Sequence, residues 1–140
     1  MTTQKDVATL LLRLTLAAGF LSSVASRLSL WGQHSSGWEK FLKYTGEVNS
    51  FAPISLIPFL AITATILETG FGGLLLIGLM TRFAAIASSV LTLIFALAMT
   101  YSFGIKEPLD YSVFVFSGAA FLLSTATQYR WSIDEKINRS

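Results

Sequence analysis

Long apolar runs separated by short polar stretches dominate this chain. Four runs cover residues 7–26, 48–81, 83–105 and 111–129, and the charged side chains within them are Arg13 and Glu68. A helix needs about 20 mostly apolar residues to cross a bilayer core of roughly 30 Å. Backbone polar groups inside that core must be satisfied within the segment itself. The runs lack the strict alternation of barrel strands, so they predict membrane-spanning helices.

The expected fold class is therefore all-α, an integral membrane four-helix bundle that forms a single domain over residues 1–140. The spans are predicted at about Val7–Leu30, Ile54–Leu79, Phe83–Phe103 and Tyr111–Thr127. Only a tight turn separates the second span from the third, so these two helices should be antiparallel neighbours.

The first connection is longer than the others and has a pattern of its own. Apolar and small side chains recur in it at helical spacing, at Trp38, Phe41, Leu42, Thr45 and Val48. Charged residues four apart occupy another face. We predict a short amphipathic helix on the membrane surface in this first outer loop. The alternative is an irregular loop with scattered aromatic residues.

Composition narrows the possible chemistry. Hydrophobic residues make up 53% of the chain and charged residues 13%, whereas a soluble domain carries about 25% charged residues. The absence of cysteine excludes thiol catalysis and cysteine-ligated metals. The lone histidine, His34, lies in a polar loop and cannot form a His-rich metal site. We expect no metal and no intrinsic cofactor, and a net charge of +2 without a basic stripe predicts no nucleic-acid partner.

The positive charges favour one orientation in the membrane. An even number of spans puts both termini on one side, with five basic residues: Lys5, Arg82, Arg130, Lys136 and Arg139. The other side has three, Lys40, Lys43 and Lys106, or four if Arg27 is counted. The positive-inside rule then predicts cytoplasmic termini. Ser23-Val24-Ala25 weakly resembles a signal-peptide cleavage site, but Arg13 splits the apolar region before it, so a retained first span is expected.

Arg13 and Glu68 are the charges that need an explanation. Translocon scales put such a residue at about +2.5 to +3.5 kcal/mol at a helix centre. The helical rise places both residues at similar depths from the end of the bundle that holds the termini. We predict an Arg13–Glu68 pair, because each buried charge makes the other tolerable. The pair either fixes helix register or belongs to a polar pocket in which Glu68 handles protons or contacts a ligand; alternatively, Arg13 snorkels alone and Glu68 stays protonated.

Two further groups of residues are candidates for the site. Arg27 ends the first span and Asp110 opens the fourth, so they form a candidate outer pair, unless Asp110 only caps its helix. Gly72 and Gly73 follow Glu68. Small residues in such helices commonly allow close helix contact. The alternative is that they line a pocket for a flat ligand such as a quinone ring.

Several stretches, taken in order, resemble the DoxX family of small four-helix bacterial membrane proteins. They are Leu11-Leu12-Arg13-Leu14 with Gly19-Phe20-Leu21, Glu68 with Gly72–Gly78, the turn Thr81-Arg82, and Pro108–Ser112. The resemblance implies a multi-pass protein of the bacterial inner membrane associated with respiratory or redox-stress systems. It also implies that Arg13 and Glu68 match the family's characteristic polar positions.

The function expected from these observations is an accessory subunit in membrane redox or oxidative-stress metabolism, more a non-catalytic subunit of an oxidoreductase system than an enzyme. Its partners would be the lipid bilayer and an oxidoreductase, and its ligand a quinone-like molecule held near Arg13 and Glu68. The alternatives are a small transporter or permease using Glu68, or a structural anchor for a soluble enzyme. The oligomeric state stays open, a homo-oligomer included.

Overall fold

The regular structure is helical throughout the part of the chain that the computed structural model describes, residues 3–139. The helices are α1 (Gln4–Arg27), α2 (Trp38–Val48), α3 (Ile57–Ile77), α4 (Thr81–Phe103), α5 (Lys106–Asp110), α6 (Val113–Ser124) and α7 (Ile133–Arg139), with 3-10 turns at Gly32–His34 and Ile54–Leu56. The prediction of an all-α bundle is confirmed. By length and composition, α1, α3 with its preceding turn, and α4 can each cross a membrane, and α6 is a shorter apolar helix.

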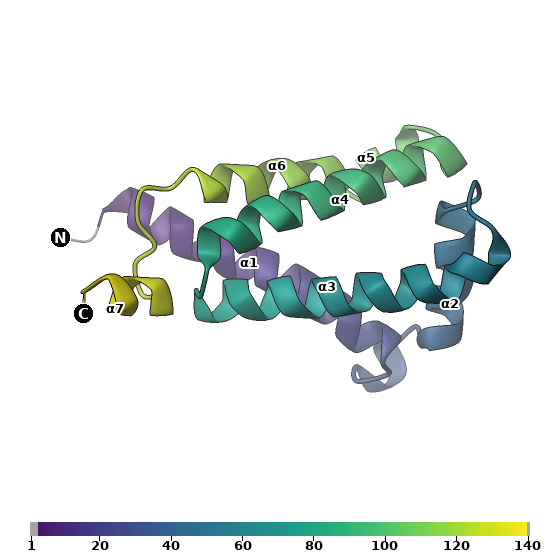
Figure 1. Cartoon of the computed structure of the whole chain (residues 1–140), viewed down its shortest axis with the longest axis horizontal. Coiled ribbons are helices and arrows are strands. Elements are labelled where there is room, and N and C mark those ends of the chain that lie inside the picture. Colours follow the sequence, from purple (N-terminus) through teal and green to yellow (C-terminus); the bar gives the residue numbers. More distant parts are fainter. Residues whose placement is uncertain (1–2, 140) are drawn as a thin grey trace.

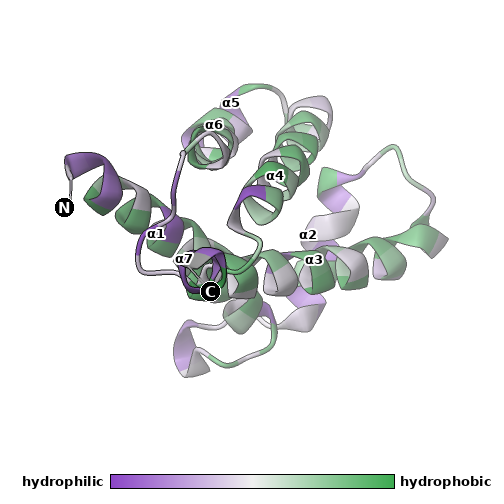
Figure 2. Ribbon diagram, turned by 60° about the vertical axis from the view of Figure 1, so that its left-hand side comes forward, coloured by the Kyte–Doolittle hydropathy of each residue, from purple (hydrophilic) through white to green (hydrophobic). Residues whose placement is uncertain are grey.

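The helices form two packed pairs, α1 with α3 and α4 with α6 (Figure 1). α1 crosses α3 obliquely, while α3 and α4 diverge from the tight turn that joins them (Figure 1). Both chain ends lie at the end of the bundle that holds this turn, and α2 lies across the opposite end (Figure 1). Figure 2 shows hydrophobic residues along α3 and α4, and hydrophilic residues at the start of α1 and in α7.

The fourth span differs from its predicted bounds, Tyr111–Thr127. It begins only at Val113, because Ser112 adopts a left-handed conformation with φ of 57° that separates α5 from α6. It ends at Ser124, where Arg82 donates from Nε to the Ser124 carbonyl and from Nη2 to that of Ala126. These contacts satisfy carbonyls that a helix end leaves without partners. At 12 residues, α6 extends over about 18 Å, less than the bilayer core.

The main core lies near the end of the bundle that holds both termini. Its fully or nearly buried members come from four helices: Leu16, Ala17, Phe20, Leu75, Ala84, Ala85, Ala120 and Leu123. The many alanines let the helices approach closely, as small residues do in membrane bundles. Within the α4–α6 pair, the hydroxyls of Ser89 and Ser117 each donate to the other residue's carbonyl, at 2.9 and 2.8 Å.

The C-terminal segment is docked onto the turn between α3 and α4. Asp134 accepts hydrogen bonds from the backbone N–H groups of Met80 and Thr81, at 2.8 and 2.7 Å, and so caps the start of α4. Its own N–H donates to the carbonyl of Gly78 at 2.9 Å. Gly78 has a φ of 73°, and a Cβ there would collide with Arg13 and Ser132, so glycine is required on both counts.

The predicted amphipathic helix is confirmed as α2, Trp38–Val48. Its buried residues, Thr45 and Val48, face into the bundle, and Val48 packs with Ala98 and Met99 of α4. The carbonyl of Val48 also accepts a hydrogen bond from Ser102. α2 therefore closes one end of the bundle through its inner face.

Candidate functional site

A buried ion pair joins the end of α1 to the middle of α3. Arg27 Nη1 lies 2.6 Å from Glu68 Oε2, and each residue is only 6% exposed. The same nitrogen donates to the hydroxyl of Thr65 at 3.0 Å. The guanidinium carbon also lies 3.8 Å from the centroid of the Phe41 ring of α2, a cation–π contact. Arg27 thus connects three helices at one point.

The predicted Arg13–Glu68 pair is wrong. Arg13 is buried at 3% exposure, but its Nη2 donates to the carbonyl of Trp131 at 3.0 Å, beside the turn between α3 and α4. The prediction assumes that α1 and α3 begin and end at the same level, but Arg13 is level with Gly78, just past the end of α3, because a Cβ on Gly78 would collide with its guanidinium. Arg27, 14 residues further along the oblique α1 (Figure 1), meets the middle of α3.

The predicted outer pair of Arg27 and Asp110 is also wrong. The Arg27 guanidinium is taken by Glu68, and Asp110 forms an exposed ion pair with Lys106, one turn earlier in α5. Asp110 ends α5 and does not open α6, so it does not act as the cap of the fourth span.

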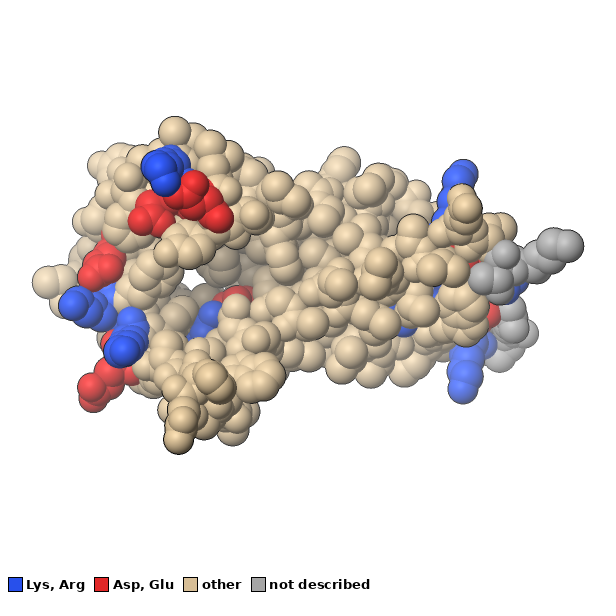
Figure 3. Space-filling view, turned by 180° about the vertical axis from the view of Figure 1, so that it is seen from behind, with Lys and Arg blue, Asp and Glu red and all other residues tan. Residues whose placement is uncertain are grey.

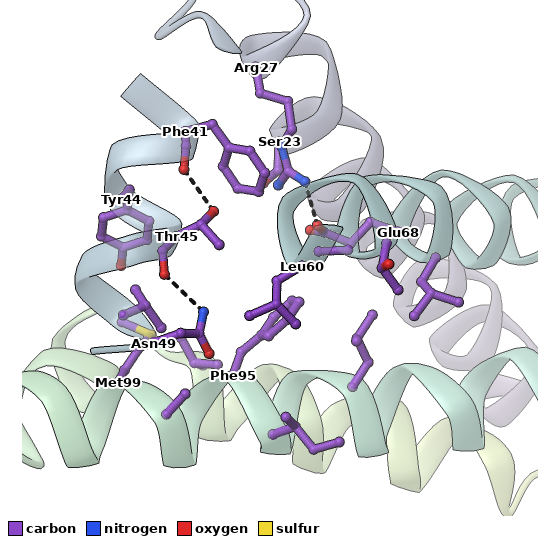
Figure 4. A pocket seen from close by; sticks show the side chains of 18 of the residues that line it. Ser23, Arg27, Phe41, Tyr44, Thr45, Asn49, Leu60, Glu68, Phe95 and Met99 are labelled. Carbon is purple, nitrogen blue, oxygen red and sulfur yellow. Dashed lines mark hydrogen bonds and ion pairs between the residues drawn. The ribbon is translucent and has the colours of Figure 1, made fainter. Parts of the chain in front are cut away.

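A cavity of about 420 Å³ surrounds the Arg27–Glu68 pair. Its walls come from α1, α2, α3 and α4, together with Tyr111 and the first residue of α6, Val113. Figure 4 shows the carboxylate of Glu68 pointing toward the guanidinium of Arg27, with Phe41 next to the guanidinium and Phe95 across the space. The volume lies within the range of about 300–1,000 Å³ found for small-molecule sites. The charged residues among its lining are Arg27 and Glu68.

The ion pair leaves one donor and one acceptor available in the cavity. Arg27 Nη2 and Glu68 Oε1 make no hydrogen bond to another described residue, and neither atom is fully enclosed. By contrast, Arg27 Nε is fully enclosed and has no partner among the described residues. A molecule in the cavity can therefore accept a hydrogen bond from Nη2 and donate one to Oε1.

Aromatic and polar side chains form the rest of the cavity wall. The aromatic residues are Phe41, Tyr44, Phe95 and Tyr111, and the uncharged polar residues without rings are Ser23, Thr45, Asn49 and Thr63. Thr45 donates to the Phe41 carbonyl at 2.7 Å and Asn49 to the Thr45 carbonyl at 2.9 Å (Figure 4). These bonds stay within α2 and its end, so they order the helix that closes the cavity.

Tyr44 lies on α2, outside the membrane-spanning segments. Burial raises the pKa of its hydroxyl, and the nearby Glu107, Tyr111 and Glu47 raise it further. The hydroxyl therefore stays protonated at neutral pH and can donate a hydrogen bond.

The glycines predicted as cavity lining do not line it. Gly72 is buried against α1, where a Cβ would lie 3.0 Å from Leu21 and 3.2 Å from Phe20, so it serves close packing of α1 on α3. A Cβ on Gly73 would meet no atom within 4 Å. Of the two interpretations offered by the sequence, helix packing therefore applies to Gly72, and the cavity lies elsewhere on α3.

Sequence reasoning missed the contribution of α2 to the site. The apolar stripe that contains Phe41, Thr45 and Val48 was visible, but a stripe of this kind does not reveal what it packs against. No group of three His, Cys, Asp or Glu side chains lies together among the residues that the structure describes.

The fold and cavity define a class of protein: a multi-pass helical membrane protein with a polar site inside its bundle. Comparison with known families makes this more specific. The DoxX family model matches residues 8–101, well over half of the chain, and the chain belongs to the DoxX family. The match includes Arg27, Glu68 and the turn between α3 and α4. No curated protein and no solved structure matches the chain.

Proposed function

We propose that this protein binds a flat, quinone-like molecule in the cavity around Arg27 and Glu68. In this proposal it acts as an accessory subunit of membrane redox or oxidative-stress metabolism in the bacterial inner membrane, with both termini in the cytoplasm. The single observation that carries the proposal is the buried ion pair with a free donor and a free acceptor inside a cavity walled by aromatic residues.

The chemistry of the pair suits both redox forms of such a ligand. A quinone carbonyl accepts from Arg27 Nη2. A quinol hydroxyl can accept from that nitrogen and also donate to Glu68 Oε1. A hydrogen bond to a charged group contributes about 1.5–3 kcal/mol, and the low-polarity surroundings strengthen it. The rings of Phe41 and Phe95 supply flat apolar surface for the ligand ring.

An accessory role fits the residues that surround the cavity better than catalysis does. The chain has no cysteine, and its one histidine, His34, is exposed and does not line the cavity. Electron transfer to or from the ligand would then be carried out by a partner oxidoreductase. Such a partner should co-purify with the protein in mild detergent, and loss of the gene should raise sensitivity to quinones.

A transporter that uses Glu68 and a structural anchor remain the competing functions. The core between the ion pair and the end that holds the termini is closely packed, with Leu16, Ala17 and Leu75 at most 3% exposed. This packing supports binding over passage through the bundle. Glu68-dependent uptake into proteoliposomes without a partner would favour the transporter.

Binding of menadione, a naphthoquinone without a side chain, tests the proposal. The protein is reconstituted in lipid nanodiscs, and quenching of tryptophan fluorescence is measured. Trp38 is a suitable reporter, because its ring centroid lies 5.5 Å from that of Phe41. We expect saturable binding by the wild type, and a loss of at least tenfold in the double variant Arg27→Met/Glu68→Leu.

The matched control removes another ion pair near the α2 end. Lys106→Gln/Asp110→Asn eliminates an exposed pair that does not line the cavity, so menadione should bind this variant like the wild type. Equal binding by the two double variants would contradict the proposal, as would a wild type that does not bind menadione.

A further inference from the structure

The cavity opens toward the side of the bundle. Figure 3 looks at the molecule across its long axis and shows a hollow near the end that holds α2, with both basic and acidic atoms visible inside it. The charged residues that line the cavity are Arg27 and Glu68. Glu68 lies 11 residues after the start of α3 and nine before its end, so it is near the middle of that span. The hollow therefore faces sideways at the depth of the spanning helices.

α1 and α6 form the two edges of this opening. Closer to the end with the termini, Phe116 closes the space between them: its ring centroid lies 5.0 Å from that of Phe20, and it packs directly on Gly19. About one helical turn further toward α2, Ser23 of α1 and Val113 of α6 line the cavity instead. Ser23 is exposed and Val113 is half-buried, so the gap between the two helices is not filled there.

The route along the axis of the bundle is closed. At one end, α2 lies across the cavity with Thr45 and Val48 buried, and Ser102 of α4 bonds to the carbonyl of Val48. At the other end lies the packed core, which includes Leu16 and Leu75. Because both ends are closed, the cavity connects with its surroundings through the sides of the bundle, and the gap between α1 and α6 is one such side.

We infer that the ligand enters from the bilayer through the opening between α1 and α6, and that it carries an apolar chain that stays in this opening. The inference rests on the proposed function and makes its ligand more specific. The ligand is a membrane-dissolved quinone with an isoprenoid-like chain, rather than a water-soluble ring alone. Its head lies at Arg27 and Glu68, and its chain passes between Ser23 and Val113 into the lipid.

Two ligands that share the same quinone ring distinguish binding of the ring from binding of the isoprenoid chain. Menadione has no side chain, and menaquinone-4 has the same ring with an isoprenoid chain. Both are titrated into nanodiscs that contain wild type, Ser23→Phe or Val113→Phe, with ligand concentration expressed per lipid. Either phenylalanine narrows the opening and leaves both charged side chains, Arg27 and Glu68, in the protein. Overfilling such a space weakens binding of the chain, so we expect menaquinone-4 to bind about tenfold more weakly.

In the same variants, menadione should lose clearly less affinity than menaquinone-4, because only menaquinone-4 has a chain that must pass through the opening. Ala18→Phe is the control: Ala18 is exposed on α1 but does not line the cavity, so neither ligand should be affected. If menadione binds and both ligands respond equally to Ser23→Phe and Val113→Phe, or neither responds, the side opening is not the path of the chain, and the proposed function still stands. If the wild type binds neither ligand, the proposed function fails and this inference fails with it.

Discussion

Arg27, the last residue of α1, donates to Glu68 in the middle of α3 across 2.6 Å, and both side chains are almost completely buried. The oblique crossing of the two helices brings these residues together (Figure 1). A buried pair contributes little net stability, because the desolvation of both charges offsets their attraction. Net stability alone therefore does not account for this pair, which is consistent with the proposed role of Arg27 and Glu68 in ligand binding.

The energetics of this pair lead to a first prediction. Arg27→Met leaves the carboxylate of Glu68 buried without its partner and should lower the free energy of unfolding by about 3–5 kcal/mol. The double variant Arg27→Met/Glu68→Leu removes both charges and should be as stable as the wild type or more stable. Circular dichroism during unfolding in mild detergent measures the free energy of unfolding of both variants. A double variant as unstable as the single one would contradict the claim that Arg27 and Glu68 form a buried ion pair.

Two neighbouring glycines allow a matched test of helix packing. Gly72→Ala adds a Cβ at 3.0 Å from Leu21 and should push α1 away from α3, at a cost of about 1–3 kcal/mol. Gly73→Ala adds the same group to open space and should be neutral or slightly stabilising. Thermal unfolding of the two variants side by side is the measurement. Equal midpoints would show that the contact between α1 and Gly72 is not as described.

Gly78, in the turn between α3 and α4, can be compared with Gly32, in the loop after α1. Gly78→Ala and Gly32→Ala both place a Cβ at a residue with positive φ, 73° and 60°, which costs about 1–2 kcal/mol. At Gly78 the added group also collides with Arg13 and Ser132, whereas at Gly32 it meets nothing within 4 Å. Gly78→Ala should therefore be the more destabilising by about 1–3 kcal/mol in the same unfolding assay. The opposite order would mean that the C-terminal segment is not docked there.

Asp134 makes part of the stability depend on pH. Burial raises the pKa of this carboxyl group, but hydrogen bonds from Thr81 and Met80, together with the charge of Arg13, outweigh it and lower the pKa below the ordinary 3.8. Because the folded pKa is lower than the unfolded one, the stabilisation is fully present above about pH 4 and is lost as the pH falls through the folded value. The loss therefore occurs in acid, below pH 3.8.

The variant Asp134→Asn isolates this contribution. It should be less stable than the wild type at pH 7, and the difference should shrink as the pH is lowered below 3.8. Unfolding midpoints at pH 7, 5 and 3 measure it. A difference that is the same at all three values would show that the charge of Asp134 does not support the cap of α4.

The long helices and α2 could be predicted because their signals are local. Apolar length specifies the spans, and the spacing from Trp38 to Val48 specifies α2. The break between α5 and α6 was missed, since it depends on the left-handed conformation of Ser112, a residue type that does not mark such a turn. α7 was missed as well, because it is a short polar helix whose position depends on its contacts with the turn between α3 and α4.

The site was predicted only in part. Glu68 was identified correctly as a buried charge that needs a partner, but its partner depends on how far α1 extends past α3 and on its tilt, which the sequence does not encode locally. Arg13 is level with Gly78 at the end of α3, so the residue of α1 that reaches Glu68 is Arg27. The cavity walls from α2 were beyond reach for the same reason, because they depend on how an amphipathic helix is placed across the bundle end.

Structure determination of the protein in lipid with menadione tests the central claim most directly. The account predicts that the naphthoquinone ring lies in the cavity beside Phe41, with one carbonyl oxygen within hydrogen-bond distance of the Arg27 guanidinium while Arg27 stays paired with Glu68. A ring bound elsewhere on the bundle, or an Arg27 side chain that points away from Glu68 into solvent or lipid, would contradict it.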